Sequence, residues 1–156
     1  MTGIIPTHLT DALPSQLKQH IMSLTHIEHI GIAVKDMATA KARYEQLLGT
    51  SCYKEEVVES EGVTTAFFQV GQSKIELLEA TNPESVIAKF IVKRGEGMHH
   101  IAYAVDDIRA EMERLRHQGF TLLNETPKEG ADNKWVCFAH PRDANGVLVE
   151  LCEERA

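Results

Sequence analysis

The fold of this chain is decided by a nine-residue stretch that occurs twice, first as His29-Ile30-Gly31-Ile32-Ala33-Val34-Lys35-Asp36-Met37 and again as His100-Ile101-Ala102-Tyr103-Ala104-Val105-Asp106-Asp107-Ile108. The two copies are offset by 71 residues. Each begins as an apolar run rich in β-branched residues, which is typical of a strand, and then passes an aspartate that can cap a helix. We therefore expect a strand followed by a helix in both halves of the chain.

Apolar residues recur at helical spacing after each aspartate, and three short runs rich in Val, Phe and Ile follow each predicted helix. These runs predict strands at residues 53–58, 63–70 and 74–79 in the first copy and at residues 121–125, 134–140 and 146–153 in the second. The chain thus reads as an α+β fold made of two tandem βαβββ modules. We expect an N-terminal extension at residues 1–25, modules at 26–80 and 98–156, and a linker with a short helix at 81–97, beginning near Pro83.

Composition narrows the functional classes. The chain has 156 residues, of which 43% are hydrophobic and 25% charged, with a net charge of −7. This balance gives no electrostatic basis for binding nucleic acid or an anionic membrane. We expect no membrane span and no export signal, and hence a cytoplasmic protein. Three widely spaced cysteines form no metal or disulfide motif, so we expect them to be reduced residues of core strands.

Alternation within the first strand of each module predicts a cavity. His29 shares its face with Gly31 and Ala33, and His100 shares its face with Ala102 and Ala104, so small residues stand beside each imidazole. The repeat aligns His100 with His29, so we expect the neighbouring His99 either to support the site from behind the ligands or to be structural. We expect His26 to lie at the surface, and His140 to shape a turn beside Pro141.

The last strand of each module carries the pattern E-L-x-E within an apolar run. Glu76 follows His29 by 47 residues, and Glu150 follows His100 by 50. A carboxylate in an apolar strand is costly to bury unless it is paired or coordinated. We therefore predict that a divalent metal is held by four residues, His29, Glu76, His100 and Glu150. The second acids, Glu79 and Glu153, have the opposite parity and are expected to be solvated.

Several stretches resemble one family in particular. These are His29-Ile-Gly-Ile-Ala-Val, Lys74-Ile-Glu-Leu-Leu-Glu, Gly97-Met-His-His-Ile-Ala-Tyr-Ala-Val-Asp-Asp-Ile and His140-Pro-Arg-Asp-Ala-Asn-Gly-Val-Leu-Val-Glu-Leu. They resemble the vicinal oxygen chelate superfamily and, within it, the methylmalonyl-CoA epimerases. The resemblance implies a curved mixed sheet around a metal site with the same four ligands. It also implies Co²⁺ as cofactor, with Mn²⁺, Ni²⁺ or Zn²⁺ as alternatives. The substrate would be an acyl-CoA and the assembly a homodimer.

The resemblance also implies interconversion of the R and S epimers of methylmalonyl-CoA by abstraction of the α-proton through a metal-stabilised enolate. One bacterial relative has a glutamate, assigned as a base, where this chain has Thr65, which cannot act as one. Our hypothesis is that Glu76 and Glu150 are the two catalytic bases. Lys89, Lys93, Arg94 and Lys134 are candidate cations for the CoA phosphates, or else solvated side chains.

Three other functions remain open at this stage. A lyase of the glyoxalase I type would use the same ligands on a glutathione hemithioacetal. An iron(II) ring-cleaving dioxygenase would need only two histidines and one carboxylate. A metal-free binding protein of the same fold would need none of the four residues.

Overall fold

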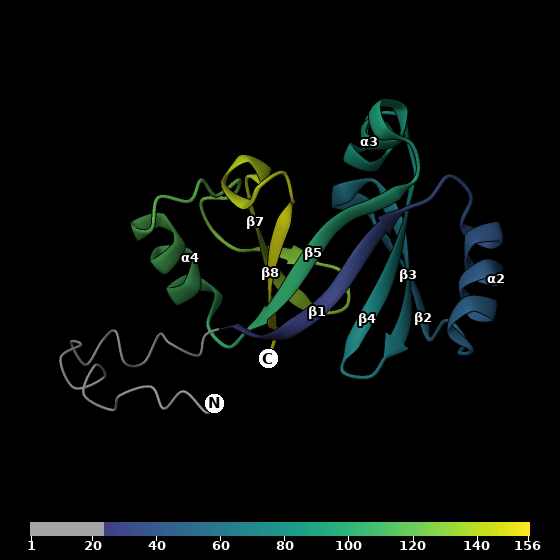
Figure 1. Ribbon diagram of the computed structural model, residues 1–156, viewed down its shortest axis with the longest axis horizontal. Coiled ribbons are helices and arrows are strands. Elements are labelled where there is room, and N and C mark those ends of the chain that lie inside the picture. The colour runs from purple at the N-terminus through teal and green to yellow at the C-terminus, as the bar shows by residue number, and fades with distance from the viewer. Residues whose placement is uncertain (1–23) are drawn as a thin grey trace, which may run out of the picture.

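The structure is a computed structural model that describes residues 24–156 (Figure 1). Most of the predicted N-terminal extension lies outside the described residues, but Leu24 and Thr25 already belong to the first strand. The elements of the first half are β1 (Leu24–Ala33), α2 (Met37–Leu48), β2 (Lys54–Val58), the 3₁₀ turn η2 (Glu59–Glu61), β3 (Val63–Val70) and β4 (Ser73–Ala80). Then come α3 (Val86–Arg94), β5 (Gly97–Val105), α4 (Ile108–His117), β6 (Lys128–Gly130), β7 (Lys134–Ala139), η3 (Pro141–Ala144) and β8 (Val149–Glu154).

All eight strands form one mixed sheet in the order β2-β3-β4-β1-β5-β8-β7-β6. β1 and β5 are antiparallel neighbours at its centre, and each is parallel to the last strand of its own half, β4 or β8. The sheet curls so that its edges approach each other, and α2 and α4 lie on its outer side at opposite ends (Figure 1). The predicted α+β fold with a curved mixed sheet is confirmed.

Each outer helix covers a core of its own. Met37 and Ala40 of α2 pack on Val34, Phe68 and Leu77. Under α4 the equivalent core contains Val105, Ile108, Met112, Leu115, Cys137 and Leu151. The apolar stripes of the sequence therefore face the outer side of the sheet, and the inner side is left to the polar site. No helix within residues 24–156 is long and apolar enough to cross a membrane.

The second acid of each E-L-x-E pattern is not solvated, contrary to expectation. Glu79 accepts a hydrogen bond from the backbone N–H of Met37, the first residue of α2. Glu153 accepts one from the N–H of Ile108 at the start of α4, with an N···O distance of 2.7 Å. Each carboxylate thus accepts a hydrogen bond from a backbone N–H that has no partner within the helix. Its negative charge is also stabilised by the positive end of the helix dipole.

The predicted strand at residues 121–125 does not form. Only Leu122 pairs with β7, through an isolated bridge to Ala139. The side chain of Asn124 accepts the hydrogen bond from the N–H of Phe138 that a strand carbonyl would otherwise take. The short strand β6 forms further along the chain instead. A second difference is Cys52, which is half-buried in the loop before β2 rather than in a strand.

Gly31 allows the two central strands to bring the histidines together. It lies opposite His100 in the β1–β5 pairing. A Cβ at this position would stand 2.1 Å from Cε1 of the His100 ring, which is far closer than contact distance. The small residue that the sequence places beside His29 therefore makes room for the imidazole of the other module.

We predict that Gly31→Ala displaces the His100 ring and lowers the free energy of unfolding by about 1–3 kcal/mol, as overpacking of a filled site does. Chemical denaturation measures this change. In a His100→Ala background the same substitution should cost little, because the clashing ring is gone. An equal cost in both backgrounds would contradict the proposed clash.

Candidate metal centre and active site

The four residues predicted as metal ligands lie together on the inner side of the sheet. They come from its four central strands: His29 from β1, Glu76 from β4, His100 from β5 and Glu150 from β8. Register explains the convergence, because Gly31 stands between Glu76 and His100 in one cross-strand row, and Ala102 stands between His29 and Glu150 in the next. All four side chains are buried.

One atom of each side chain meets the others in a compact cluster. Nε2 of His29 lies 2.9 Å from Nε2 of His100, 3.1 Å from Oε2 of Glu76 and 3.2 Å from Oε2 of Glu150. Nε2 of His100 lies 2.9 Å from Oε2 of Glu150 and 3.4 Å from Oε2 of Glu76. Ligands bound to a first-row ion at about 2.0–2.2 Å stand roughly 3 to 3.5 Å apart. The donor set and its spacing therefore fit a divalent cation.

The electrostatics of the cluster favour added positive charge. Burial opposes protonation of His100, but Glu150 and Glu76 outweigh it and raise the pKa of His100 to about 9. The pKa of His29 is also raised, against burial, chiefly by Glu76 and Glu150. The same contacts lower the pKa values of Glu76 and Glu150, although burial alone would raise them. Two buried carboxylates thus attract cations to this point.

Glu28 is a buried acid beside the cluster that the sequence analysis missed. The β1–β5 register passes from Ile27–Tyr103 to His29–Ala102, so β1 has an extra residue, Glu28, at a β-bulge. The bulge places Glu28 and His29, which are consecutive, on the same inner side. Both are buried, and Oε2 of Glu28 contacts Nδ1 of His29. A carboxylate on the second ring nitrogen fixes the orientation of a metal-binding histidine.

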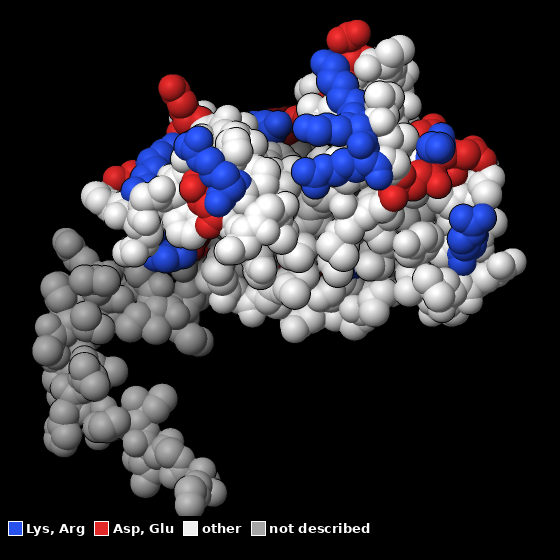
Figure 2. Space-filling view, turned by 45° about the horizontal axis from the view of Figure 1, so that its top comes forward, with Lys and Arg blue, Asp and Glu red and all other residues white. Residues whose placement is uncertain are grey.

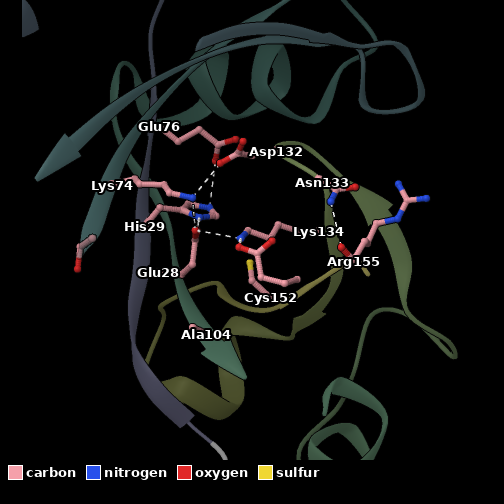
Figure 3. Close-up of polar contacts among 12 residues, drawn as sticks. Glu28, His29, Lys74, Glu76, Ala104, Asp132, Asn133, Lys134, Cys152 and Arg155 are labelled. Atoms are coloured by element: carbon pink, nitrogen blue, oxygen red, sulfur yellow. Dashed lines mark hydrogen bonds and ion pairs between the residues drawn. The ribbon is translucent and has the colours of Figure 1, made fainter. Parts of the chain in front are cut away.

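Two lysines hold Glu28 in turn (Figure 3). Nζ of Lys74 lies 2.7 Å from Oε1 of Glu28 and 2.8 Å from Oδ2 of Asp132, and Nζ of Lys134 lies 3.7 Å from Glu28. Burial would raise the pKa of Glu28, but the contacts with His29 and Lys74 lower it to about 2. Lys134 is buried and also contacts Glu154, so it does not supply a cation for CoA, contrary to one of the sequence-based alternatives.

A second possible ligand group overlaps the first. Glu28, His29 and Cys152 also lie close enough together to share an ion. However, burial raises the pKa of the Cys152 thiol well above its usual range, next to the negative charge of Glu150. A protonated thiol is a poor ligand. The group built on His29, His100 and Glu150, with Glu76 beside it, is therefore the better metal centre.

His99 stands at the matching bulge on β5. The register passes from Gly31–His100 to Ile32–Met98, leaving His99 as the extra residue. Its Nδ1 lies 2.9 Å from Nδ1 of His100, and its ring packs edge-on against Phe90. Burial and the neighbouring His100 lower the pKa of His99 to about 4. Each predicted ligand histidine therefore has its preceding residue against its Nδ1.

The remaining histidines behave as follows. His26 is half-buried and contacts Thr25, and Nδ1 of His140 accepts a hydrogen bond from the N–H of Arg142, which shapes the turn as expected. His117 is an exposed partner of Glu113. His8 and His20 lie outside the described residues.

A cavity of about 320 Å³ opens onto the cluster from the inside of the curled sheet. Glu76, His100 and Glu150 form its polar end, and its walls include Val63, Leu78, Ile87, Val136 and Phe138. Thr65 also lines it, buried and with its hydroxyl 3.3 Å from the carbonyl oxygen of Glu56. At the mouth, Lys128 and Glu61 form an ion pair of 2.5 Å. The space is suited to a small, mostly apolar ligand with a polar end that faces Glu76, His100 and Glu150.

The fold and the site together define the class. A sequence model of the Glyoxalase/Bleomycin resistance protein/Dioxygenase superfamily matches residues 28–138, and this chain belongs to that superfamily. Methylmalonyl-CoA epimerase, mitochondrial, from Homo sapiens is 37% identical over 151 residues, covering 94% of this chain and 86% of that protein. Ethylmalonyl-CoA/methylmalonyl-CoA epimerase from Cereibacter sphaeroides is 42% identical over 127 residues, covering 80% and 95%.

A solved structure of an epimerase is also similar to this chain. A variant of the Streptomyces coelicolor methylmalonyl-CoA epimerase, in complex with 2-nitronate-propionyl-CoA, superposes with a TM-score of 0.83 at 36% identity. The match covers 86% of this chain and 100% of that one. Within its superfamily, this chain is a member of the methylmalonyl-CoA epimerase family, as the sequence resemblance indicated.

We predict that Glu28→Gln weakens metal binding by about 10- to 100-fold, because the neutral amide holds the His29 ring less firmly and no longer pairs with Lys74. Competition of the protein with a chromogenic chelator for Co²⁺ measures the dissociation constant. The matched control is Glu55→Gln, which removes an exposed carboxylate of β2 paired with Lys41. Equal metal affinities for Glu28→Gln and the control would show that Glu28 does not support the site.

Proposed function

We propose that this protein interconverts (R)- and (S)-methylmalonyl-CoA, with His29, Glu76, His100 and Glu150 as ligands of a divalent metal. The observation that carries the proposal is the convergence of these four side chains at the end of an apolar cavity, in a chain that belongs to the epimerase family. We also propose Co²⁺ as the native ion, with Mn²⁺, Ni²⁺ or Zn²⁺ as alternatives, a homodimer as the assembly and the cytoplasm as the location.

The chemistry of the substrate suits this site. Its α-carbon lies between a thioester carbonyl and a carboxylate, so the electron pair of a broken C–H bond can move into the thioester as an enolate. When bound, the divalent ion stabilises the negative charge that develops on the substrate oxygens. The apolar walls of the cavity exclude water from that charge, which strengthens its interactions.

Proton transfer is assigned to Glu76 and Glu150. They approach the cluster from opposite ends of the four-strand row, on β4 and β8, which suits bases that act on opposite faces of one carbon. In one direction one glutamate, as a carboxylate, takes the α-proton, while the other, protonated, gives its proton to the opposite face. Metal binding lowers the basicity of a carboxylate, so each glutamate would loosen from the metal when it takes a proton. The two exchange protonation states in each turnover. His29, held by Glu28, keeps its ring fixed during the transfer.

The first test is α-proton exchange of one methylmalonyl-CoA epimer in D₂O, followed by NMR. We expect deuterium uptake with epimerisation for the purified protein, loss of both after chelation, and recovery with Co²⁺. Bound metal without deuterium uptake would remove the epimerase assignment. Glutathione hemithioacetals would then be assayed, because the same ligand set serves a lyase of the glyoxalase I type.

A second test separates the two bases. We expect Glu76→Gln and Glu150→Gln each to lower the epimerisation rate by about 10²–10⁴-fold, the usual range for one acid or base. Each variant should still exchange the α-proton of one epimer without inverting it, and the two variants should favour opposite epimers. Glu55→Gln, which removes an exposed carboxylate of β2 outside the cavity, is the matched control. A Glu76→Gln variant that binds metal and turns over near the normal rate would exclude Glu76 as a base and direct attention to Glu61.

A further inference from the structure

A second hollow, of about 270 Å³, lies beside the metal-site cavity and has not been assigned a role. It is a notch between the last turn of α3 and the loop that joins η3 to β8. The two spaces share three residues, His99, His100 and Leu148. A molecule that enters the notch therefore reaches the wall of the cavity in which the reacting group would sit.

The notch has an apolar lining that is open to solvent. Met98 is 60% exposed and Val147 is 39% exposed, and Phe90 and Leu148 complete the apolar surface. His99, the extra residue at the β5 bulge, also lines this space. Such a surface suits an unbranched, mostly uncharged chain rather than a second charged group.

Arg94 supplies a cation at the outer end of the notch. Its guanidinium lies 6.0 Å from the centre of the Phe90 ring, and within residues 24–156 it forms no ion pair. By contrast, Lys128 at the cavity mouth is already neutralised by Glu61. Lys93 stands in the same helical turn as Arg94. Lys and Arg side chains gather around the α3 region on the face shown in Figure 2.

The charge of the whole chain is unfavourable for a polyanionic ligand. With a net charge of −7, the protein as a whole repels a polyanion. An acyl-CoA carries its phosphates at the far end of the pantetheine arm, so a local cation near that end would offset the repulsion. A guanidinium is well suited to phosphate because it can donate two parallel hydrogen bonds.

We propose that the notch binds the pantetheine arm of the acyl-CoA substrate and that Arg94 pairs with the coenzyme's phosphates. The inference rests on the proposed function and adds to it the route by which the substrate enters. The acyl group lies in the cavity, the arm passes His99 and Val147 at the beginnings of the central strands β5 and β8, and the nucleotide end remains outside beside α3.

The test compares equilibrium binding of two ligands, propionyl-CoA and propionyl-pantetheine, which lacks the nucleotide and its phosphates. Isothermal titration calorimetry with the metal-loaded protein gives both dissociation constants without requiring turnover. We expect Arg94→Gln to weaken propionyl-CoA binding by about 10-fold or more, the usual loss for one hydrogen bond to a charged group. Binding of propionyl-pantetheine should not change. Arg109→Gln, which removes an exposed charge on α4, is the control and should bind both ligands as the wild type does.

A second variant tests the apolar part of the notch. Val147→Glu places a carboxylate on the path of the arm and should weaken both ligands. Val92→Glu makes the same change at a 90% exposed position of α3 outside the notch and should weaken neither. The two kinds of variant thus report on separate parts of the ligand.

The proposal is overturned if Arg94→Gln binds propionyl-CoA as the wild type does, if it weakens both ligands equally, or if the wild-type protein binds propionyl-CoA no more tightly than propionyl-pantetheine. These outcomes differ from failure of the proposed reaction, which is the absence of epimerisation by the wild-type protein. If the expected binding pattern is observed but the wild-type protein does not epimerise the substrate, the binding role of the notch is supported and the proposed reaction is rejected.

Discussion

The structure of this protein depends on the contacts among four ionisable side chains that are buried at one point. Two carboxylates in an apolar interior are costly unless positive charge accompanies them. In the structure the imidazoles of His29 and His100 provide it, which is why their pKa values rise while those of Glu76 and Glu150 fall. A divalent ion bound to neutral imidazoles would supply the same two positive charges that two protons supply. The site is therefore balanced for a cation of that charge.

The repeated module explains why the same residues serve both the fold and the site. In each E-L-x-E pattern the first acid faces inward to the cluster, and the second, three residues later, faces outward to the start of a helix. Strand alternation separates the two roles by side. One short motif thus holds the start of the outer helix against the sheet and places a proposed ligand on the inner side, and each module does both.

The sequence predicted the parts of the site that follow regular strand geometry. The four proposed ligands share one face because β4 and β8 alternate regularly around Glu76 and Glu150, and β1 and β5 alternate regularly from His29 and His100 onward. Glu28 escaped prediction because strict alternation assigns it to the outer side, whereas a bulge turns it inward. Glu79 and Glu153 were misassigned because their partners are backbone N–H groups at helix starts, which no pattern of side chains reveals. The segment 121–125 has strand-like residues, but Asn124 takes over a backbone hydrogen bond.

The two bulges stand at matching positions in the modules, but the residues in them differ. Each inserts one residue before a predicted ligand histidine, so each histidine has a neighbour at its Nδ1. On β1 this neighbour is Glu28, an anion held by two lysines inside the sheet. On β5 it is His99, a neutral ring that lines both the cavity and the notch. The acidic neighbour is sealed within the protein and can fix its ligand through charge. The neutral neighbour stands where an acyl-CoA would pass, and a carboxylate there would repel both that anion and its thioester oxygen. The same local distortion of a strand thus places an acid behind one proposed metal ligand and an uncharged ring beside the proposed substrate path on the other side of the site.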